Sequence, residues 1–146
     1  MTKKSIFDTC GVDVESEDNG VWKTLLINEN LKVKVRSAQS DLFQDPYHKA
    51  GLKVSRIVDK KNKTYSETKK IAGNMNTSVI NFALLDWEGF IGEDGKEIKF
   101  STAKAREILL DPRLRDVLAE IVDLVSSPET FKSQDELGAK DLIEKN

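Results

Sequence analysis

Apolar and polar residues alternate at period two within residues 21–36, which predicts a pair of β-strands. In the second strand Leu31, Val33 and Val35 alternate with basic residues, so one face should pack on the core and the other should face water. The polar connection Asn28-Glu29-Asn30 has the length of an ordinary hairpin loop. This segment therefore predicts an N-terminal β-hairpin with one solvated face.

Helical spacing replaces this alternation after residue 40. Asp45-Pro46 is a helix-start signal, because Asp accepts hydrogen bonds from free N–H groups and Pro suits the first helical position. The apolar stripe that follows predicts a helix to about Val58. Ser66 can cap a second helix, whose apolar stripe ends near Leu85. We therefore expect a pair of helices here.

A second hairpin and the C-terminal helices are predicted from residue 87 onward. The turn Glu93-Asp94-Gly95 joins two short β-like segments within residues 87–100. Ser101 can cap a helix that reaches Leu110, and Asp111-Pro112 ends that helix and begins another, which ends near Ser126. Apolar residues recur at helical spacing in this last helix, namely Leu114, Val117, Leu118, Ile121, Leu124 and Val125.

Together these elements predict an α+β fold that is mostly helical and has one core. We expect residues 1–20 to form a loose, acidic N-terminal arm, residues 21–132 a single globular domain, and residues 133–146 a weakly ordered tail. The predicted core contains Phe82, Trp87, Ile98, Phe100, Leu109, Leu118 and Ile121.

Composition narrows the functional classes. The net charge of −2 gives no global basic field for nucleic acid or anionic membrane. The longest unbroken apolar run has four residues, whereas a membrane span needs about 20. Cys10 and His48 are the only residues of their types, which excludes an internal disulfide and a zinc site of Cys and His ligands within one chain. We expect a soluble, intracellular protein.

The densest charge feature is the stretch from Lys49 to Lys70, where eight basic residues accompany two acidic ones. This stretch is either a local site for nucleic acid or an acidic partner, or the solvated face of two helices. Tyr65 is its only aromatic residue, and no helix-turn-helix spacing accompanies it, which favours the solvated face.

No constellation of residues indicates catalysis. The acidic residues near the 93–95 turn lack the spacing of a calcium loop, and a surface turn would not raise the pKa of a carboxyl group for acid–base work. His48 has no Ser or Asp partner at a fixed spacing, and Cys10 has no neighbouring cation or helix start that would activate its thiol. No glycine-rich phosphate-binding motif occurs. We expect a protein that is not an enzyme and has no cofactor, metal or catalytic residue.

The order of several motifs resembles the tail assembly chaperones of long-tailed, siphovirus-type bacteriophages. The motifs are Leu31-Lys-Val-Lys-Val-Arg-Ser-Ala38, Asp45-Pro-Tyr-His-Lys-Ala50, Trp87-Glu-Gly89, Glu93-Asp-Gly95, Phe100-Ser101 and Leu109-Leu-Asp-Pro112. The resemblance covers about residues 20–132, and none of its motifs is catalytic. The Lys49–Lys70 stretch departs from it by being unusually basic.

This resemblance implies a function in tail assembly. It implies that the chain binds the long, helical tape measure protein in the host cytoplasm, keeps it soluble until tail tube subunits polymerise around it, and is absent from the mature virion. The tail tube protein is a further partner on this view. Two other functions stay open: a small nucleic-acid-binding regulator that uses Lys49–Lys70, and a structural tail component retained in the virion.

The predicted partner surface comes from stripe geometry alone. The apolar stripe of the last helix is wider than one buried side needs, and such a helix either lies deep in a core or offers an edge to another chain. On the second alternative Val122, Phe131 and Leu137 form a partly exposed surface for the tape measure protein or for self-association. Burial of the same residues in the core is the other alternative.

Overall fold

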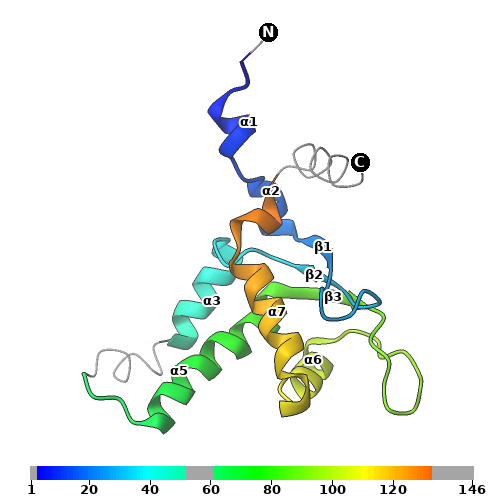
Figure 1. Cartoon of the computed structure of the whole chain (residues 1–146). Coiled ribbons are helices and arrows are strands. Elements are labelled where there is room, and N and C mark those ends of the chain that lie inside the picture. Colours follow the sequence, from blue (N-terminus) through cyan, green and yellow to red (C-terminus); the bar gives the residue numbers. More distant parts are fainter. Residues whose placement is uncertain (1–2, 52–60, 133–146) are drawn as a thin grey trace.

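The computed structural model describes residues 3–51 and 61–132, in which helices pack against a small antiparallel sheet (Figure 1). The predicted α+β, mostly helical class is confirmed. In chain order the elements are α1 (Ile6–Cys10), α2 (Val14–Asn19), β1 (Val21–Thr24), β2 (Lys32–Val35), α3 (Asp41–Gly51), α5 (Tyr65–Ser78), the π-helical turn η1 (Val79–Ala83), β3 (Leu84–Glu88), α6 (Thr102–Leu109), the 3₁₀ turn η2 (Pro112–Leu114), α7 (Arg115–Ser126) and the 3₁₀ turn η3 (Pro128–Phe131).

The predicted N-terminal hairpin is confirmed. Strands β1 and β2 pair antiparallel with Val21 opposite Val35, and the Leu25 N–H donates to the Leu31 carbonyl at 2.9 Å at the closed end. The side chains of Val33 and Val35 are fully buried, as the alternation predicts. The inner face of the sheet is therefore part of the core, against which α7 packs.

The third strand, β3, was not predicted. The second helix does end close to the expected residue, but Leu84–Glu88 then pairs antiparallel with β2, so that Val33 lies opposite Trp87. The Arg36 N–H also donates to the Ala83 carbonyl at 2.7 Å. This long-range pairing overrides the local helical pattern. The predicted 87–100 hairpin is present in a short form: Ile91 forms an antiparallel bridge with Glu97, and the N–H groups of Ile98 and Gly92 donate to the carbonyls of Phe90 and Lys96 at 2.7 and 2.8 Å.

The predicted starts of α3 and α5 were wrong by a few residues. Helix α3 begins at Asp41 rather than Asp45, because the Ser40 Oγ accepts from the Leu42 N–H at 3.2 Å, and Pro46 lies inside the helix. The predicted residues beyond Gly51 lie outside the described part of the chain. Helix α5 begins after Thr64 instead of Ser66, since Thr64 and Glu67 form a reciprocal capping box.

Helices α6 and α7 are where the sequence places them. The Ser101 hydroxyl accepts from the Lys104 N–H at 3.1 Å, as predicted for the cap of α6. Asp111-Pro112 ends this helix, and the single turn η2 leads into α7. The predicted break between two helices is confirmed.

The segment predicted as a loose arm contains two short helices. None of the residues of α1 is buried, and it projects from the body in Figure 1. Helix α2, in contrast, is bonded to the domain: the Ser37 N–H donates to the Glu17 carbonyl at 3.0 Å, and the Ser40 hydroxyl donates to the Asp18 carboxylate at 2.6 Å. The expectation was wrong for α2 because its acidic side chains have partners on the 36–40 segment. The composition of residues 1–20 gives no sign that Glu17 and Asp18 have these hydrogen-bond partners.

The core is formed by the sheet, η1, α6 and α7. Of the predicted core residues, Trp87, Leu109, Leu118 and Ile121 are buried, whereas Phe82, Ile98 and Phe100 are half-buried and pack against them. The Trp87 ring stacks on Phe90 with centroids 4.2 Å apart, and its Nε1–H donates to the Ile98 carbonyl at 2.7 Å. Trp87 thus anchors the 89–100 segment to the sheet.

Candidate partner-binding groove

Helix α7 presents one buried face and one open edge. Val117, Leu118, Ile121 and Val125 are buried, while Val122 is half-buried beside them. These positions follow the 3.6-residue period, so the apolar surface continues from the core to the edge of the helix. This edge forms one wall of a groove.

The groove lies between α7, the end of α6 and the second half of α5, and its volume is about 370 Å³. Its apolar lining comprises Leu109, Leu110, Pro112, Leu118, Ala119 and Val122. The polar side chains at its border are Asn76, Asp111, Arg115 and Asp123. We call this surface the α7 groove. Leu110 is 47% exposed within it, which is high for a large apolar side chain next to a core.

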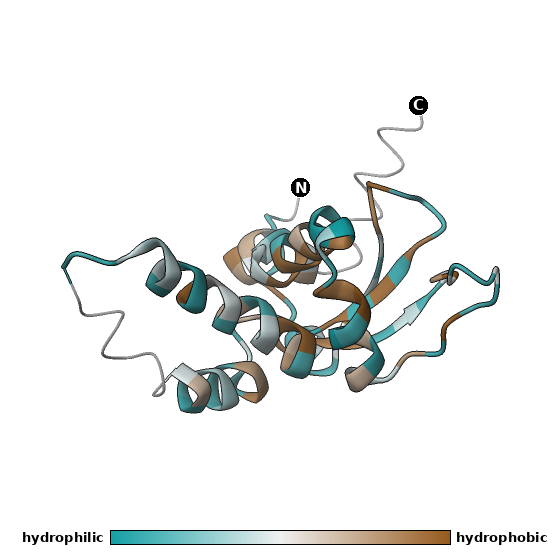
Figure 2. Cartoon of the chain, turned by 90° about the horizontal axis from the view of Figure 1, so that it is seen from below, coloured by the Kyte–Doolittle hydropathy of each residue, from teal (hydrophilic) through white to brown (hydrophobic). Residues whose placement is uncertain are grey.

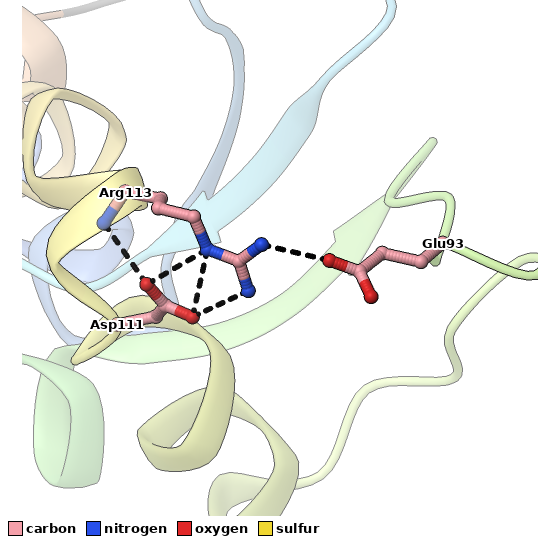
Figure 3. Close-up of polar contacts among 3 residues, drawn as sticks. All are labelled: Glu93, Asp111 and Arg113. Carbon is pink, nitrogen blue, oxygen red and sulfur yellow. Dashed lines mark hydrogen bonds and ion pairs between the residues drawn. The ribbon is translucent and has the colours of Figure 1, made fainter.

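The corner between α6 and α7 is stiffened by Arg113 (Figure 3). The Asp111 side chain accepts from the Arg113 backbone N–H at 2.9 Å and from its guanidinium Nη2 at 2.8 Å. The guanidinium Nη1 also donates to the Glu93 carboxylate at 2.8 Å. One cation therefore connects the helix corner to the 91–97 loop.

This contact predicts a pH effect on stability. The hydrogen bond from the Arg113 side chain is the main cause that lowers the pKa of Asp111 from 3.8 to about 2. A lowered folded-state pKa stabilises the fold at pH values above the unfolded pKa, and this contribution disappears as the pH falls through about 2. We expect the difference in melting temperature between the wild type and Asp111→Asn to shrink as the pH is lowered from about 4 to about 2. A constant difference over that range would contradict the assignment.

A second, larger groove of about 910 Å³ lies between the 91–99 segment and α6. Ile91, Ile98, Ile108 and Leu114 supply its apolar lining, and Ile91 is 59% exposed. We call it the 91–108 groove. The charged residues at its border are Glu93, Asp94, Lys96, Glu97, Lys99, Lys104, Glu107, Asp111 and Arg113.

The three residues predicted for partner binding have different locations. Val122 lines the α7 groove at its open edge. Phe131 is fully buried, so the expectation of partial exposure was wrong for it. Leu137 lies outside the described residues. The N-terminal segment covers Phe131: the Asp13 N–H donates to the Phe131 carbonyl at 2.8 Å, and Val12 forms a bridge with Lys132.

His48 and Cys10, which the sequence analysis considered as catalytic residues, both lie on the surface. His48 is exposed, and its Nε2 is 2.8 Å from the Gln44 Oε1 one helical turn away. Cys10 is exposed on α1. Within residues 3–51 and 61–132, no group of three or more His, Cys, Asp or Glu side chains is arranged to hold a metal ion. No helix in this part of the chain is long and apolar enough to cross a membrane.

Sequence reasoning missed two exposed apolar features. Leu110 directly follows α6, is 47% exposed and lines the α7 groove, and the sequence analysis did not single it out. Leu26 is 95% exposed in the β1–β2 loop, which the Glu120 carboxylate holds by accepting the backbone N–H groups of Leu26 and Ile27 at 2.5 and 2.9 Å. In the sequence, the only signal for the exposed Leu26 was that Leu26 and Ile27 stand directly before the polar turn Asn28-Glu29-Asn30.

Comparison with known proteins shows that the chain is similar to a family of prophage proteins. The family model described as YdaY prophage protein matches residues 38–141, which is more than half of the chain. The match includes α3, α5, β3, α6 and α7, and therefore all three helices of the α7 groove. No curated protein and no solved structure matched the chain.

Proposed function

The chain belongs to the YdaY prophage protein family and is therefore phage-derived, and from this premise we propose that it is a tail assembly chaperone. In this role it binds the tape measure protein and keeps it soluble while tail tube subunits assemble. The order of sequence motifs, from the β2 strand to the Asp111-Pro112 break, supports the proposal by its resemblance to such chaperones.

The α7 groove is the observation that carries the proposal. Its apolar lining, with Leu110 exposed and Val122 at the edge, suits the apolar stripe of an amphipathic helix. A tape measure protein offers many such stripes, because it is long and helical. The proposed role needs a binding surface and no catalytic residue.

Co-expression with the tape measure protein of the same phage tests this proposal. Leu110→Asp should lower the amount of tape measure protein that co-purifies by at least about tenfold, because a charge would be placed in the apolar lining of the groove. Val122→Asp should act in the same direction, with circular dichroism used to confirm that the variant is folded. The measurement is the soluble tape measure protein bound to the tagged chain.

Leu42→Asp is the matched control. Leu42 is 54% exposed on α3, is comparable to Leu110 in exposure and does not line the α7 groove. This variant should bind as the wild type does. Equal loss in Leu110→Asp and Leu42→Asp, or no loss in either, would contradict the assignment of the groove.

The proposed location is the host cytoplasm. A chaperone leaves the tail once the tube protein has covered the tape measure, so the chain should be absent from purified virions by mass spectrometry. A structural tail component would instead be found there in a fixed ratio to the tube protein. That outcome would replace the proposed function by its nearest alternative.

A further inference from the structure

The outer end of the α3 and α5 helices carries the densest positive charge of the chain. Residues 49–70 contain eight basic and two acidic residues, which leaves 15 basic and 23 acidic residues in the rest of the chain. In Figure 2 the two helices extend away from the rest of the domain, and the outer part of α5 is mostly hydrophilic. The described residues of this end that we call the basic tip are Lys49, Lys61, Lys63, Tyr65, Lys69 and Lys70.

The five lysines of the basic tip are exposed, and none of them forms an ion pair with another described residue. In contrast, Lys104 and Arg113 lie 3.3 and 2.8 Å from neighbouring carboxylates. The single acidic residue within residues 61–70 is Glu67, whose carboxylate accepts the Thr64 N–H at 3.1 Å in the capping box of α5. The tip therefore keeps a positive excess, which attracts an anion with several negative charges.

Tyr65 places an aromatic ring among these charges. Its side chain is 81% exposed at the first residue of α5. The Lys69 Nζ, one helical turn along α5, lies 6.0 Å from the centre of the ring. A ring that offers its face, next to cations that can hold phosphate groups, combines the two contacts by which proteins bind single-stranded nucleic acid. The sequence could not show that the ring and the lysines are exposed together.

The ring and the distribution of charge favour this ligand over other polyanions. A base can stack on a side chain only where it is not paired in a duplex, so an exposed ring suits a single strand. An acidic protein segment would use the lysines and leave the ring without a function. The acidic excess outside residues 49–70 repels a polyanion from the rest of the surface, which confines binding to the tip.

We propose that the basic tip binds single-stranded nucleic acid. Tyr65 stacks on one base, while Lys69, Lys70 and the other tip lysines hold the flanking phosphate groups. Contacts to phosphate carry no sequence information, so the site accepts strands of different sequence. The inference does not depend on the chaperone function, because the α7 groove meets α5 only at Asn76, about three helical turns beyond Tyr65.

Fluorescence anisotropy of a labelled oligothymidylate of about 20 nucleotides tests this site on the full chain. The strand should bind at about 50 mM salt, and log K should fall by about 0.7 per log unit of salt for each phosphate contacted. With at least about three such contacts, the expected slope is about −2 or steeper. Absence of binding at about 50 mM salt with protein up to about 100 μM would overturn the proposal.

Charge-reversal variants locate the phosphate contacts. Lys69→Glu with Lys70→Glu should lower the affinity at least about tenfold and make the salt slope shallower by about 1.4, because two phosphate contacts are lost. The matched control is Lys96→Glu with Lys99→Glu, which changes the net charge equally at exposed residues of the 91–99 segment and should bind as the wild type does. Equal loss in both double variants would overturn the assignment to the tip. Circular dichroism confirms that the variants are folded.

Variants of Tyr65 separate stacking from charge. Tyr65→Ala should lower the affinity at least about fivefold without changing the salt slope, whereas Tyr65→Phe keeps the ring and should bind as the wild type does. Equal affinity for duplex DNA and the single strand, with no effect of Tyr65→Ala, would overturn stacking on an unpaired base. Displacement of the strand by polyglutamate at the same concentration of charge would overturn the proposal in favour of an acidic protein partner.

Discussion

Replacing Phe131 by alanine is expected to lower the free energy of unfolding by about 3–5 kcal/mol. The Phe131 side chain has no exposed surface, and its carbonyl accepts the Asp13 N–H, so the truncation leaves a buried cavity next to the N-terminal segment. The surrounding segments are held by hydrogen bonds and cannot collapse freely into that space. Urea denaturation followed by circular dichroism measures the change.

Phe7→Ala is the control for this experiment. Phe7 is 83% exposed on α1, so its truncation should change the free energy of unfolding by less than about 0.5 kcal/mol. A small effect of Phe131→Ala, similar to that of Phe7→Ala, would show that Phe131 lies on the surface after all. It would restore Phe131 to the predicted partner surface.

The elements that were predicted correctly are those specified by residues close in sequence. The β1–β2 hairpin follows from strict alternation and a short polar turn, and both signals lie within residues 21–36. The start of α6 at Ser101 and the break at Asp111-Pro112 each depend on one cap and one proline. Local rules suffice for such features because the hydrogen bonds that they describe join near neighbours.

The wrong predictions concern segments whose structure depends on distant partners. Leu84–Glu88 continues the apolar stripe of α5, yet it becomes a strand because β2 offers an unpaired edge about fifty residues earlier. Helix α2 and Phe131 were both misjudged because their partners are distant in sequence: α2 bonds to the 36–40 segment, and the Asp13 N–H donates to the Phe131 carbonyl. Neither pairing has a signature in one sequence.

The candidate site was predictable only in part. The wide apolar stripe of α7 indicated an edge for another chain, and Val122 does line a groove. The rest of the lining comes from α5, the end of α6 and the Asp111-Pro112 corner, however, and the stripe of α7 carries no information about these residues. The stripe alone could not distinguish Val122 at the edge from Phe131 in the core.

Replacing Gly89 by alanine is expected to have the second large effect, a loss of about 2–4 kcal/mol in the free energy of unfolding. Gly89 follows β3 with φ +83°, a conformation that side chains other than glycine rarely adopt. A Cβ atom at this residue would lie 1.9 Å from the backbone oxygen of Asn30. The backbone of the β1–β2 loop or of the 89–100 segment would have to move, which would disturb Trp87 and its bond to Ile98. Denaturation monitored by tryptophan fluorescence measures the change.

Gly95→Ala separates the two causes of this effect. Gly95 has a similar φ of +79°, but a Cβ atom there would meet nothing within 4 Å. Its substitution should therefore cost only the conformational part, about 1 kcal/mol. The difference between the two variants then measures the contact between residue 89 and the Asn30 backbone. If both variants lost the same free energy, the close packing of the β1–β2 loop against the end of β3 would be disproved.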